Sequence, residues 1–252
     1  MDFTKKRVLI TGGSRGIGKA CAEAFAARDA QVAINYRKNR TAAQETLAAL
    51  PGEGHQLFQA DVADPVQAQT LVEDVVRAFG GLDIVVNNAG ISQHHPIDAV
   101  TYEAWQAAWQ QTLAVNLFAP ANVMYWTVQH MKAHAGGRIV NVSSRGAFRG
   151  EPEQPAYGAS KAGLNAMSQS LAKKVAQHNI YIGVVAPGFV ETEMAASTLS
   201  GPEGESTRNQ SPFGRVARPE EVAYAVLFLA SEGAEFSTGA IIDVNGASYL
   251  RT

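Results

Sequence analysis

A glycine-rich turn near the N-terminus constrains the fold more than any other feature of the sequence. The short β-type run Arg7–Thr11 ends in Gly12-Gly13-Ser14-Arg15-Gly16-Ile17-Gly18, and an apolar helical pattern follows through Ala27. A strand, a glycine turn and a helix in this order place backbone N–H groups at a helix N-terminus, where they can receive a phosphate group. The spacing differs from the common Gly-x-Gly-x-x-Gly pattern, and a tight turn without a ligand is the alternative interpretation.

Beyond this turn, strand-type and helical segments alternate along the whole chain. Alternation at this spacing predicts an α/β fold, namely a single doubly wound Rossmann-type domain over residues 1–252. We expect a seven-stranded parallel sheet flanked by helices, with ligands at the carboxyl ends of the strands. After the first strand, the predicted strands span residues 31–35, 56–60, 82–86, 138–142, 181–186 and 239–244. The main predicted helices span residues 41–50, 65–79, stretches of 101–134, a segment starting near 155, and 219–230.

Composition excludes several classes of function. With 46% hydrophobic and 17% charged residues, the chain is neither disordered nor membrane-like. The apolar run Val222–Ala230 is well short of the ~20 residues that span a bilayer, and no signal-peptide pattern precedes the first strand, so we expect a cytoplasmic protein. The single Cys21 excludes an intrachain disulfide, and a net charge of −2 gives no reason to expect nucleic acid. His130 and His134 have metal-ligand spacing but no evident third ligand, so we expect no metal.

Tyr157 and Lys161 are the first candidate catalytic residues. They lie four residues apart in the helix predicted to start near Pro155, so their side chains share one helix face. A phenol with a pKa near ~10 exchanges protons poorly at neutral pH, and a nearby ammonium group would lower that pKa and make Tyr157 a general acid or base. Ser144 follows the strand at 138–142, where its hydroxyl could hold a substrate oxygen. Chance alone can produce one Tyr-x-x-x-Lys pair, so its weight depends on a cofactor site elsewhere.

The end of the second strand favours a particular cofactor. NAD-binding folds place a carboxylate near this position to bind the adenosine ribose hydroxyls. Residues 35–40 contain no carboxylate and three cations, Arg37, Lys38 and Arg40, and Arg15 lies in the glycine turn. This arrangement suits a 2′-phosphate and predicts NADP (NADPH), whereas a solvated charge cluster before a surface helix is the alternative.

Three other segments are candidates for the site. Asn87-Asn88-Ala89-Gly90 follows the fourth strand, where small and polar residues can lie beside a cofactor. Asn116 is polar within an apolar helical pattern and should have a specific partner. Residues 189–215 are predicted to form a substrate loop or lid, because they are polar and have little periodicity. We expect His94 and His95 to lie in an exposed loop, and a position overhanging the active site is the alternative.

Together these motifs closely resemble the short-chain dehydrogenase/reductase family. The resemblance runs from about Arg7 to Val244 and implies that Tyr157 is the proton donor or acceptor, that Ser144 hydrogen-bonds the substrate oxygen, and that Lys161 holds the nicotinamide ribose. It implies that Asn116 anchors a water near Lys161. The cofactor-binding residues that it implies are Thr11, Gly12, Ser14, Arg15, Gly16, Ile17, Gly18, Arg37, Asp61, Val62, Asn88, Ala89, Gly90, Ile91, Tyr157, Lys161, Pro187, Gly188, Val190 and Thr192.

The resemblance leaves the substrate open among small carbonyl compounds. Reduction of a free ketone or β-keto ester is the first expectation, and β-ketoacyl-[acyl-carrier-protein] reduction or sugar and polyol oxidation are alternatives. Ala135 and His178 stand where carrier-protein reductases commonly have arginines, although Arg145 and Arg149 could substitute. A protein that binds the cofactor without turnover is a different class, and the complete catalytic set argues against it. Family members commonly form tetramers with 222 symmetry, so we expect a homotetramer.

Overall fold

The computed structural model describes residues 1–251 and contains one sheet of seven parallel strands. The strand order is β3-β2-β1-β4-β5-β6-β7. The chain adds β2 and β3 on one side of β1, then returns to the middle of the sheet and adds β4 to β7 on the other side. This arrangement confirms the predicted doubly wound α/β fold. The strands are β1 (Arg7–Ile10), β2 (Gln31–Tyr36), β3 (Gln56–Gln59), β4 (Ile84–Asn87), β5 (Gly137–Val142), β6 (Ile180–Pro187) and β7 (Ile241–Val244).

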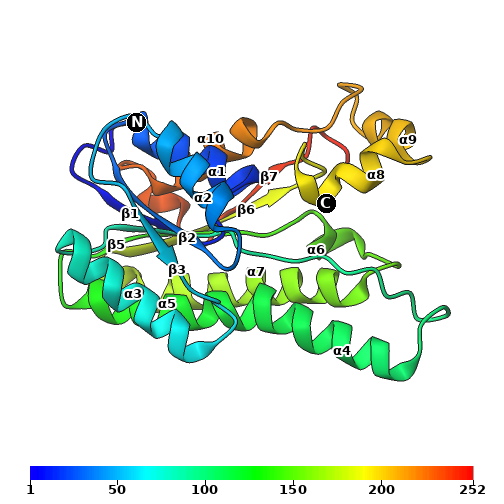
Figure 1. The fold of residues 1–252 in the computed structure, drawn as a ribbon, viewed down its shortest axis with the longest axis horizontal. Coiled ribbons are helices and arrows are strands. Elements are labelled where there is room, and N and C mark those ends of the chain that lie inside the picture. The colour runs from blue at the N-terminus through cyan, green and yellow to red at the C-terminus, as the bar shows by residue number, and fades with distance from the viewer. Residues whose placement is uncertain (252) are drawn as a thin grey trace.

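Helices cover both faces of this sheet (Figure 1). One layer consists of α1 (Gly16–Ala26), α2 (Arg40–Ala49) and α10 (Pro219–Ala230), and the other of α3 (Pro65–Phe79), α5 (Ala119–Lys132) and α7 (Pro155–Val175). The helix α4 (Tyr102–Leu113) continues into α5 through a π-helical turn, η1 (Ala114–Phe118). The short elements are α6 (Gly146–Arg149), α8 (Ala196–Ser200), α9 (Gly204–Asn209) and the 3₁₀ turns η2 (Ala176–His178), η3 (Glu193–Ala195) and η4 (Glu235–Ser237).

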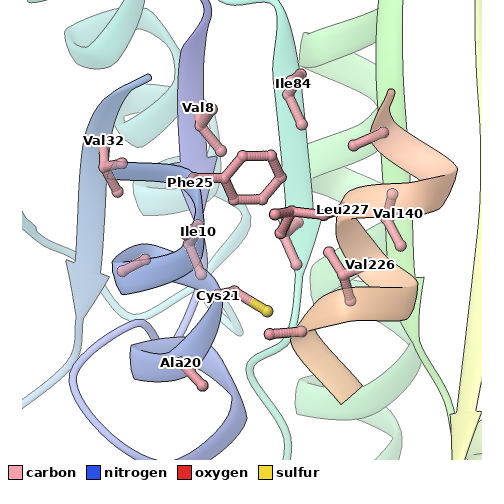
Figure 2. Packing of buried hydrophobic residues seen from close by; sticks show 14 of the residues in the cluster. Val8, Ile10, Ala20, Cys21, Phe25, Val32, Ile84, Val140, Val226 and Leu227 are labelled. Atoms are coloured by element: carbon pink, nitrogen blue, oxygen red, sulfur yellow. The ribbon is translucent and has the colours of Figure 1, made fainter. Parts of the chain in front are cut away.

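Each face of the sheet has its own apolar core. On the first face, Cys21 and Phe25 of α1 pack with Val226 and Leu227 of α10 over the central strands, as Figure 2 shows. The two helices bury apolar side chains against both the strands and each other, which explains why the strands read as nearly continuous apolar runs. Cys21 is a core residue, and burial raises the pKa of its thiol to about 12.

Local chemistry explains where the elements begin and end. Asp64 accepts hydrogen bonds from the backbone N–H groups of Val66 and Gln67 at 2.8 and 3.1 Å, so it caps α3, which begins at the predicted residue. Pro65 occupies the first turn, where its missing N–H costs no helical hydrogen bond. The seventh strand starts two residues later than predicted because Gly239 adopts a φ of 81°, which is outside the strand region.

The segment 189–215 is more structured than the sequence indicated. It contains η3, α8 and α9, and a Cβ built on Gly204 would lie 2.2 Å from the carbonyl oxygen of Leu199, so the two helices meet closely. The prediction of little regular structure was therefore wrong. Helices of five and six residues are too short to produce a periodic apolar pattern.

Within residues 1–251, no helix combines the length and apolar character that a membrane crossing requires. In the same part of the chain, no group of three or more His, Cys, Asp or Glu side chains could hold a metal ion. The rings of His130 and His134 lie 4.2 Å apart, and His130 Nε2 accepts a hydrogen bond from the Leu82 N–H at 3.2 Å. Burial and the neighbouring His134 lower the pKa of His130, so this pair has a local structural role.

Candidate active site

The glycine turn requires glycine for steric reasons. Gly12 and Gly16 adopt φ values of 62° and 52°, in the left-handed region that other residues rarely occupy. A Cβ built on Gly18 would lie 2.3 Å from the Gly12 carbonyl oxygen and 2.5 Å from Asn88 Nδ2. Only glycine at position 18 therefore lets α1 approach the turn, which leaves the N-terminal N–H groups of α1 at the carboxyl edge of the sheet.

Thr11 and Asn88, which directly follow the neighbouring strands β1 and β4, hold this turn in place. Thr11 Oγ1 accepts hydrogen bonds from the backbone N–H groups of Asn88 and Ala89 at 3.0 and 3.1 Å. Asn88 Nδ2 in turn donates to the carbonyl oxygens of Thr11 and Gly12 at 3.0 and 3.1 Å. The segments after β1 and β4 are thereby fixed relative to each other, at the edge where doubly wound folds bind ligands.

The cations predicted to recognise the cofactor are exposed and each faces a carboxylate. Arg15 Nη1 lies 2.6 Å from Glu193 Oε2, and Arg37 Nη1 lies 3.7 Å from Asp61 Oδ2. The Arg15 and Arg37 side chains are 63% and 46% exposed, so both can exchange these partners for a ligand. No carboxylate follows β2 in the sequence, but the fold brings Asp61 from the end of β3 beside Arg37.

Asn116 occupies the π-helical turn η1 and has the specific partner that its position predicts. Its Oδ1 accepts from the Ile91 N–H at 2.9 Å, and its Nδ2 donates to the Ile91 carbonyl at 2.9 Å and to Ser160 Oγ at 3.2 Å. A widened turn in a long helix often marks a functional position. Here it turns the amide toward the backbone that follows the Asn-Asn-Ala-Gly segment.

Lys161 is buried beside this amide. Its Nζ donates to the Val142 carbonyl at the end of β5 at 2.8 Å and lies 5.8 Å from the centre of the Tyr157 ring. A Cβ built on Gly90 would lie 3.5 Å from Lys161 Nζ and 3.4 Å from Asn116 Oδ1, so these three residues adjoin. Burial lowers the pKa of the Lys161 ammonium to about 8.

The Tyr157 phenol and the Ser144 hydroxyl lie close enough to influence each other, and Lys161 Nζ lies 5.8 Å from the centre of the Tyr157 ring. Burial raises the pKa of the Tyr157 phenol, and the side-chain hydrogen bond with Ser144 opposes that shift. The expectation that Lys161 lowers the pKa of Tyr157 is therefore wrong for this structure, in which desolvation is the larger effect. Ser144 Oγ also accepts from the Gly146 N–H at 3.0 Å, which fixes the serine at the start of α6.

His95 is a site residue that the sequence placed wrongly. We expected an exposed loop, and His94 is indeed exposed, but His95 is only 2% exposed and packs edge-on against Trp105. Its Nε2 accepts from the Ala156 N–H at 3.2 Å, so the proton is on Nδ1, which donates to the Gln93 carbonyl at 2.8 Å. His95 thus satisfies a free N–H in the first turn of α7, directly before Tyr157.

The chain after β6 returns to the glycine turn. The Gly188 N–H donates to the Val244 carbonyl at 3.0 Å, and a Cβ on Gly188 would meet Asn245 at 3.0 Å. Val190 pairs with Ala217 in an isolated parallel bridge. A Cβ built on Gly16 would lie 3.1 Å from Thr192 Cγ2, so Thr192, the last predicted cofactor residue of this segment, lies against the turn.

The remaining predicted cofactor residues also lie at this edge of the sheet. The Ser14 carbonyl accepts from Thr46 Oγ1 at 3.0 Å, and Ile17 packs on the first core cluster. Asp61 Oδ1 accepts from the Ala63 N–H at 3.1 Å, and Val62 is buried. The structure thus gathers the predicted residues around one edge, although their roles stay predictions.

Comparison with known proteins identifies the family. A family profile described as enoyl-(acyl carrier protein) reductase matches residues 12–247. The 3-oxoacyl-[acyl-carrier-protein] reductase FabG of Escherichia coli is 37% identical over 250 residues, covering 99% of this chain and 100% of the relative. A short chain dehydrogenase from Burkholderia cenocepacia, solved in complex with NADP, matches with a TM-score of 0.89 and 34% identity, over 98% of this chain and 99% of that chain. The chain belongs to the short-chain dehydrogenase/reductase family.

Two further relatives place the whole chain within this short-chain dehydrogenase/reductase family. The FabG reductase of Thermotoga maritima is 38% identical over 252 residues, covering 99% of this chain and all of the relative. A dehydrogenase/reductase from Sinorhizobium meliloti matches with a TM-score of 0.91 at 31% identity, over 99% of this chain and 97% of that chain. The predicted family is therefore confirmed, and the protein is an oxidoreductase.

Sequence reasoning missed Asn35, Asn141 and Ser168, which help to hold this short-chain dehydrogenase/reductase site together, although it had singled out the segment that contains Asn87. Buried Asn35 accepts from the Gly12 N–H at 3.3 Å and donates to the Ala60 carbonyl at 3.1 Å, linking the ends of β1 and β3. Asn87 Nδ2 donates to Asn141 Oδ1 at 2.8 Å, and Asn141 Nδ2 donates to Ser168 Oγ at 2.8 Å. The available signal was a polar residue at or near the end of an apolar strand, where a buried amide must find partners.

Proposed function

We propose that this enzyme reduces the carbonyl group of a ketone or β-keto ester to a secondary alcohol, using NADPH. The observation that carries the proposal is the proximity of the Tyr157 phenol to the Ser144 hydroxyl beyond the carboxyl end of β5, with Lys161 buried and held by the Val142 carbonyl. Two adjacent hydroxyl groups can both contact one carbonyl oxygen. A half-buried, neutral phenol is suited to donate its proton to the alkoxide that develops there.

The cofactor is NADP(H), and the residues present fit it. The glycine turn leaves no room for side chains at Gly12 and Gly18, so a diphosphate can approach the N-terminus of α1 closely. Arg15 and Arg37 are exposed cations whose present partners are surface carboxylates. When bound, the cofactor supplies the hydride. Both guanidinium groups could then contact a 2′-phosphate through charge-assisted hydrogen bonds.

The residues of the site either hold a neighbouring group in position or donate and stabilise a proton. Tyr157 donates its proton to the substrate oxygen, and Ser144 Oγ donates a hydrogen bond to the same atom and stabilises the negative charge that develops there. Lys161, held by the Val142 carbonyl, can carry a charge near neutral pH because its pKa is about 8. Its ammonium, one helical turn from Tyr157, then offsets part of the burial that disfavours the phenolate left after proton transfer. Asn116 fixes the backbone of Ile91 beside this lysine.

Reduction of a β-ketoacyl group on an acyl carrier protein is the second candidate. The FabG proteins of Escherichia coli and Thermotoga maritima are 3-oxoacyl-[acyl-carrier-protein] reductases, and both match nearly the whole chain. The structure gives this candidate less support than the sequence did. Arg145, one of the two arginines that we expected to receive an acidic carrier, is only 3% exposed and cannot meet a protein surface.

A substrate panel separates the candidates. NADPH oxidation would be followed by absorbance with simple ketones, β-keto esters, β-ketoacyl groups on a small thiol and on a carrier protein, and sugars. We expect the highest kcat/KM among the free ketones and β-keto esters. A carrier-bound substrate that exceeds its small-thiol counterpart by ~100-fold would instead support the second candidate. No NADPH oxidation with any of these compounds would refute carbonyl reduction.

A further inference from the structure

Arg145, which directly follows Ser144, is a buried arginine that the proposed chemistry does not use. Its side chain and backbone are 3% exposed, and its N–H donates to the Pro187 carbonyl at 2.8 Å. Nη1 donates to Ser248 Oγ at 2.6 Å and Nη2 to Gln210 Oε1 at 2.5 Å. The guanidinium carbon also lies 5.1 Å from the centre of the Phe189 ring. The arginine is therefore held in place by neutral groups.

No carboxylate lies within 4.0 Å of Arg145 among residues 1–251, and Glu151, which is near enough to raise the Arg145 pKa, lies 4.0 Å from Arg149. Both of its side-chain acceptors are uncharged, and burial lowers the pKa of its guanidinium. Buried charges in proteins are normally paired, because an unpaired one bears the full cost of desolvation. An anion from outside the chain would supply the missing partner.

A cavity of about 300 Å³ adjoins this guanidinium. Its wall contains two carboxylates, and each of them already has its own arginine. Glu221 lies 2.7 Å from Arg215, and Asp243 lies 2.7 Å from Arg251. Among the described residues that line the cavity, Arg145 is thus the one charged group without an ion-pair partner. The other lining residues that matter here are Phe189, Thr207, Ser211, Phe213 and Ser248.

We propose that this cavity binds a carboxylate, and that the substrate is a keto acid whose keto group lies at Ser144 and Tyr157. This proposal rests on the proposed carbonyl reduction. Consecutive Cα atoms are ~3.8 Å apart, so the residue that contacts the carbonyl oxygen and the residue that contacts the carboxylate are neighbours in the chain. A guanidinium has more N–H donors than the two that Arg145 uses here, and a planar carboxylate matches its geometry.

The wall of the cavity favours a carboxylate over a phosphate. A carboxylate carries one negative charge, which one guanidinium balances. A phosphate group carries close to two negative charges at neutral pH, and the second would face Glu221 and Asp243 without a free cation. Serine and threonine hydroxyls in the wall can complete the hydrogen bonds of the bound oxygens.

Matched pairs of acids and esters test the proposal. Acetoacetate, 4-oxopentanoate and 5-oxohexanoate would each be compared with the corresponding methyl ester at constant ionic strength, by kcat/KM with NADPH. The three lengths place the carboxylate at different distances from the keto group. We expect at least one acid to exceed its ester by ~10-fold, which is worth about 1.4 kcal/mol. The Arg145→Met variant should lose that preference, Arg145→Lys should keep part of it, and Arg77→Met, on the surface of α3, should retain it fully.

A binding measurement tests the carboxylate site without depending on turnover. Each acid should raise the thermal unfolding midpoint of the wild type and of Arg77→Met, whereas its ester should not, and the rise should be absent in Arg145→Met. Methionine removes a buried charge without adding volume, so Arg145→Met is expected to fold. If it does not fold, Arg145→Lys provides the test: it should lose most of the rise in the unfolding midpoint that the acid causes in the wild type. Esters that match or exceed their acids in the wild type, or an acid preference that survives in Arg145→Met, would overturn the proposal. A shift without any turnover would instead refute carbonyl reduction and leave the carboxylate site.

Discussion

Arg37 is the residue whose replacement should change the cofactor preference most. It follows β2 at the position where a carboxylate would select NAD, and its guanidinium is 46% exposed, 3.7 Å from Asp61. A charge-assisted hydrogen bond from Arg37 to a 2′-phosphate contributes about 1.5–3 kcal/mol. Releasing an exposed ion pair such as Arg37–Asp61 costs roughly 0.5 kcal/mol. The net contribution of Arg37 is then about 1–2.5 kcal/mol, or roughly 5- to 70-fold in NADPH affinity.

Arg37→Ala should therefore weaken NADPH by that factor and leave NADH nearly unchanged. Arg37→Asp should weaken NADPH further, because a second carboxylate would then stand beside Asp61 and repel the phosphate. The same carboxylate can accept hydrogen bonds from ribose hydroxyls, so NADH should bind equally well or better. Adding Arg15→Ala, which also releases Glu193, should invert the preference.

The assay is kcat/KM for NADPH and NADH against one ketone at fixed salt, because salt screens exposed charges. Lys19→Ala is a matched control, since this exposed cation lies on α1 and pairs with Glu23 rather than facing the end of β2. It should leave the ratio unchanged. A wild-type preference for NADH, or an unchanged ratio in Arg37→Asp, would refute the placement of the 2′-phosphate.

Three further predictions concern the turn, the buried lysine and the assembly. Gly18→Ala should weaken NADPH more than 10-fold in a fluorescence titration, because its Cβ would lie 2.3 Å from a backbone oxygen; an unchanged Kd would contradict the steric account. The pKa of a lysine in the unfolded chain is near ~10.4, whereas that of Lys161 in the folded protein is about 8. Between these two values the unfolded state binds more protons, so raising the pH stabilises the folded state. The free energy of unfolding of the wild type should therefore increase relative to that of Lys161→Met, by roughly 2 kcal/mol from pH 8 to 10. A constant difference in denaturant titrations would disprove that pKa. Phe118 in η1 and Tyr125 in α5 are 55% and 58% exposed, which leaves apolar surface for a second subunit to cover, so light scattering should report a tetramer. A 26.8 kDa monomer would reject this prediction.

Much of the fold was predictable because its signals are local. The strand at Arg7, the glycine turn and the cap at Asp64 each depend on residues that are close in sequence, and the structure confirms the corresponding elements. The alternation of strands and helices then allows few topologies. The short helices α8 and α9 were missed because five or six residues carry no periodic pattern.

The parts of the site that could not be predicted depend on long-range contacts. The burial of His95 follows from Trp105 and from the N-terminus of α7, more than fifty residues later, and the loop sequence around it gives no sign of either. Likewise, the sequence gives no sign that the fold buries Arg145 beside Phe189 and Gln210. The pKa of Tyr157 was misjudged because the desolvation of a side chain depends on everything packed around it.

Replacement of the Tyr157 hydroxyl tests the central claim most directly. Tyr157→Phe keeps the ring but removes the proton donor next to Ser144, so kcat for ketone reduction should fall ~100-fold or more. NADPH affinity should change little, because the phenol is remote from the phosphates and the adenine. Tyr181→Phe, a control on β6 whose ring contacts Arg138, should retain full activity. A Tyr157→Phe enzyme that turns over at nearly the wild-type rate would contradict the account.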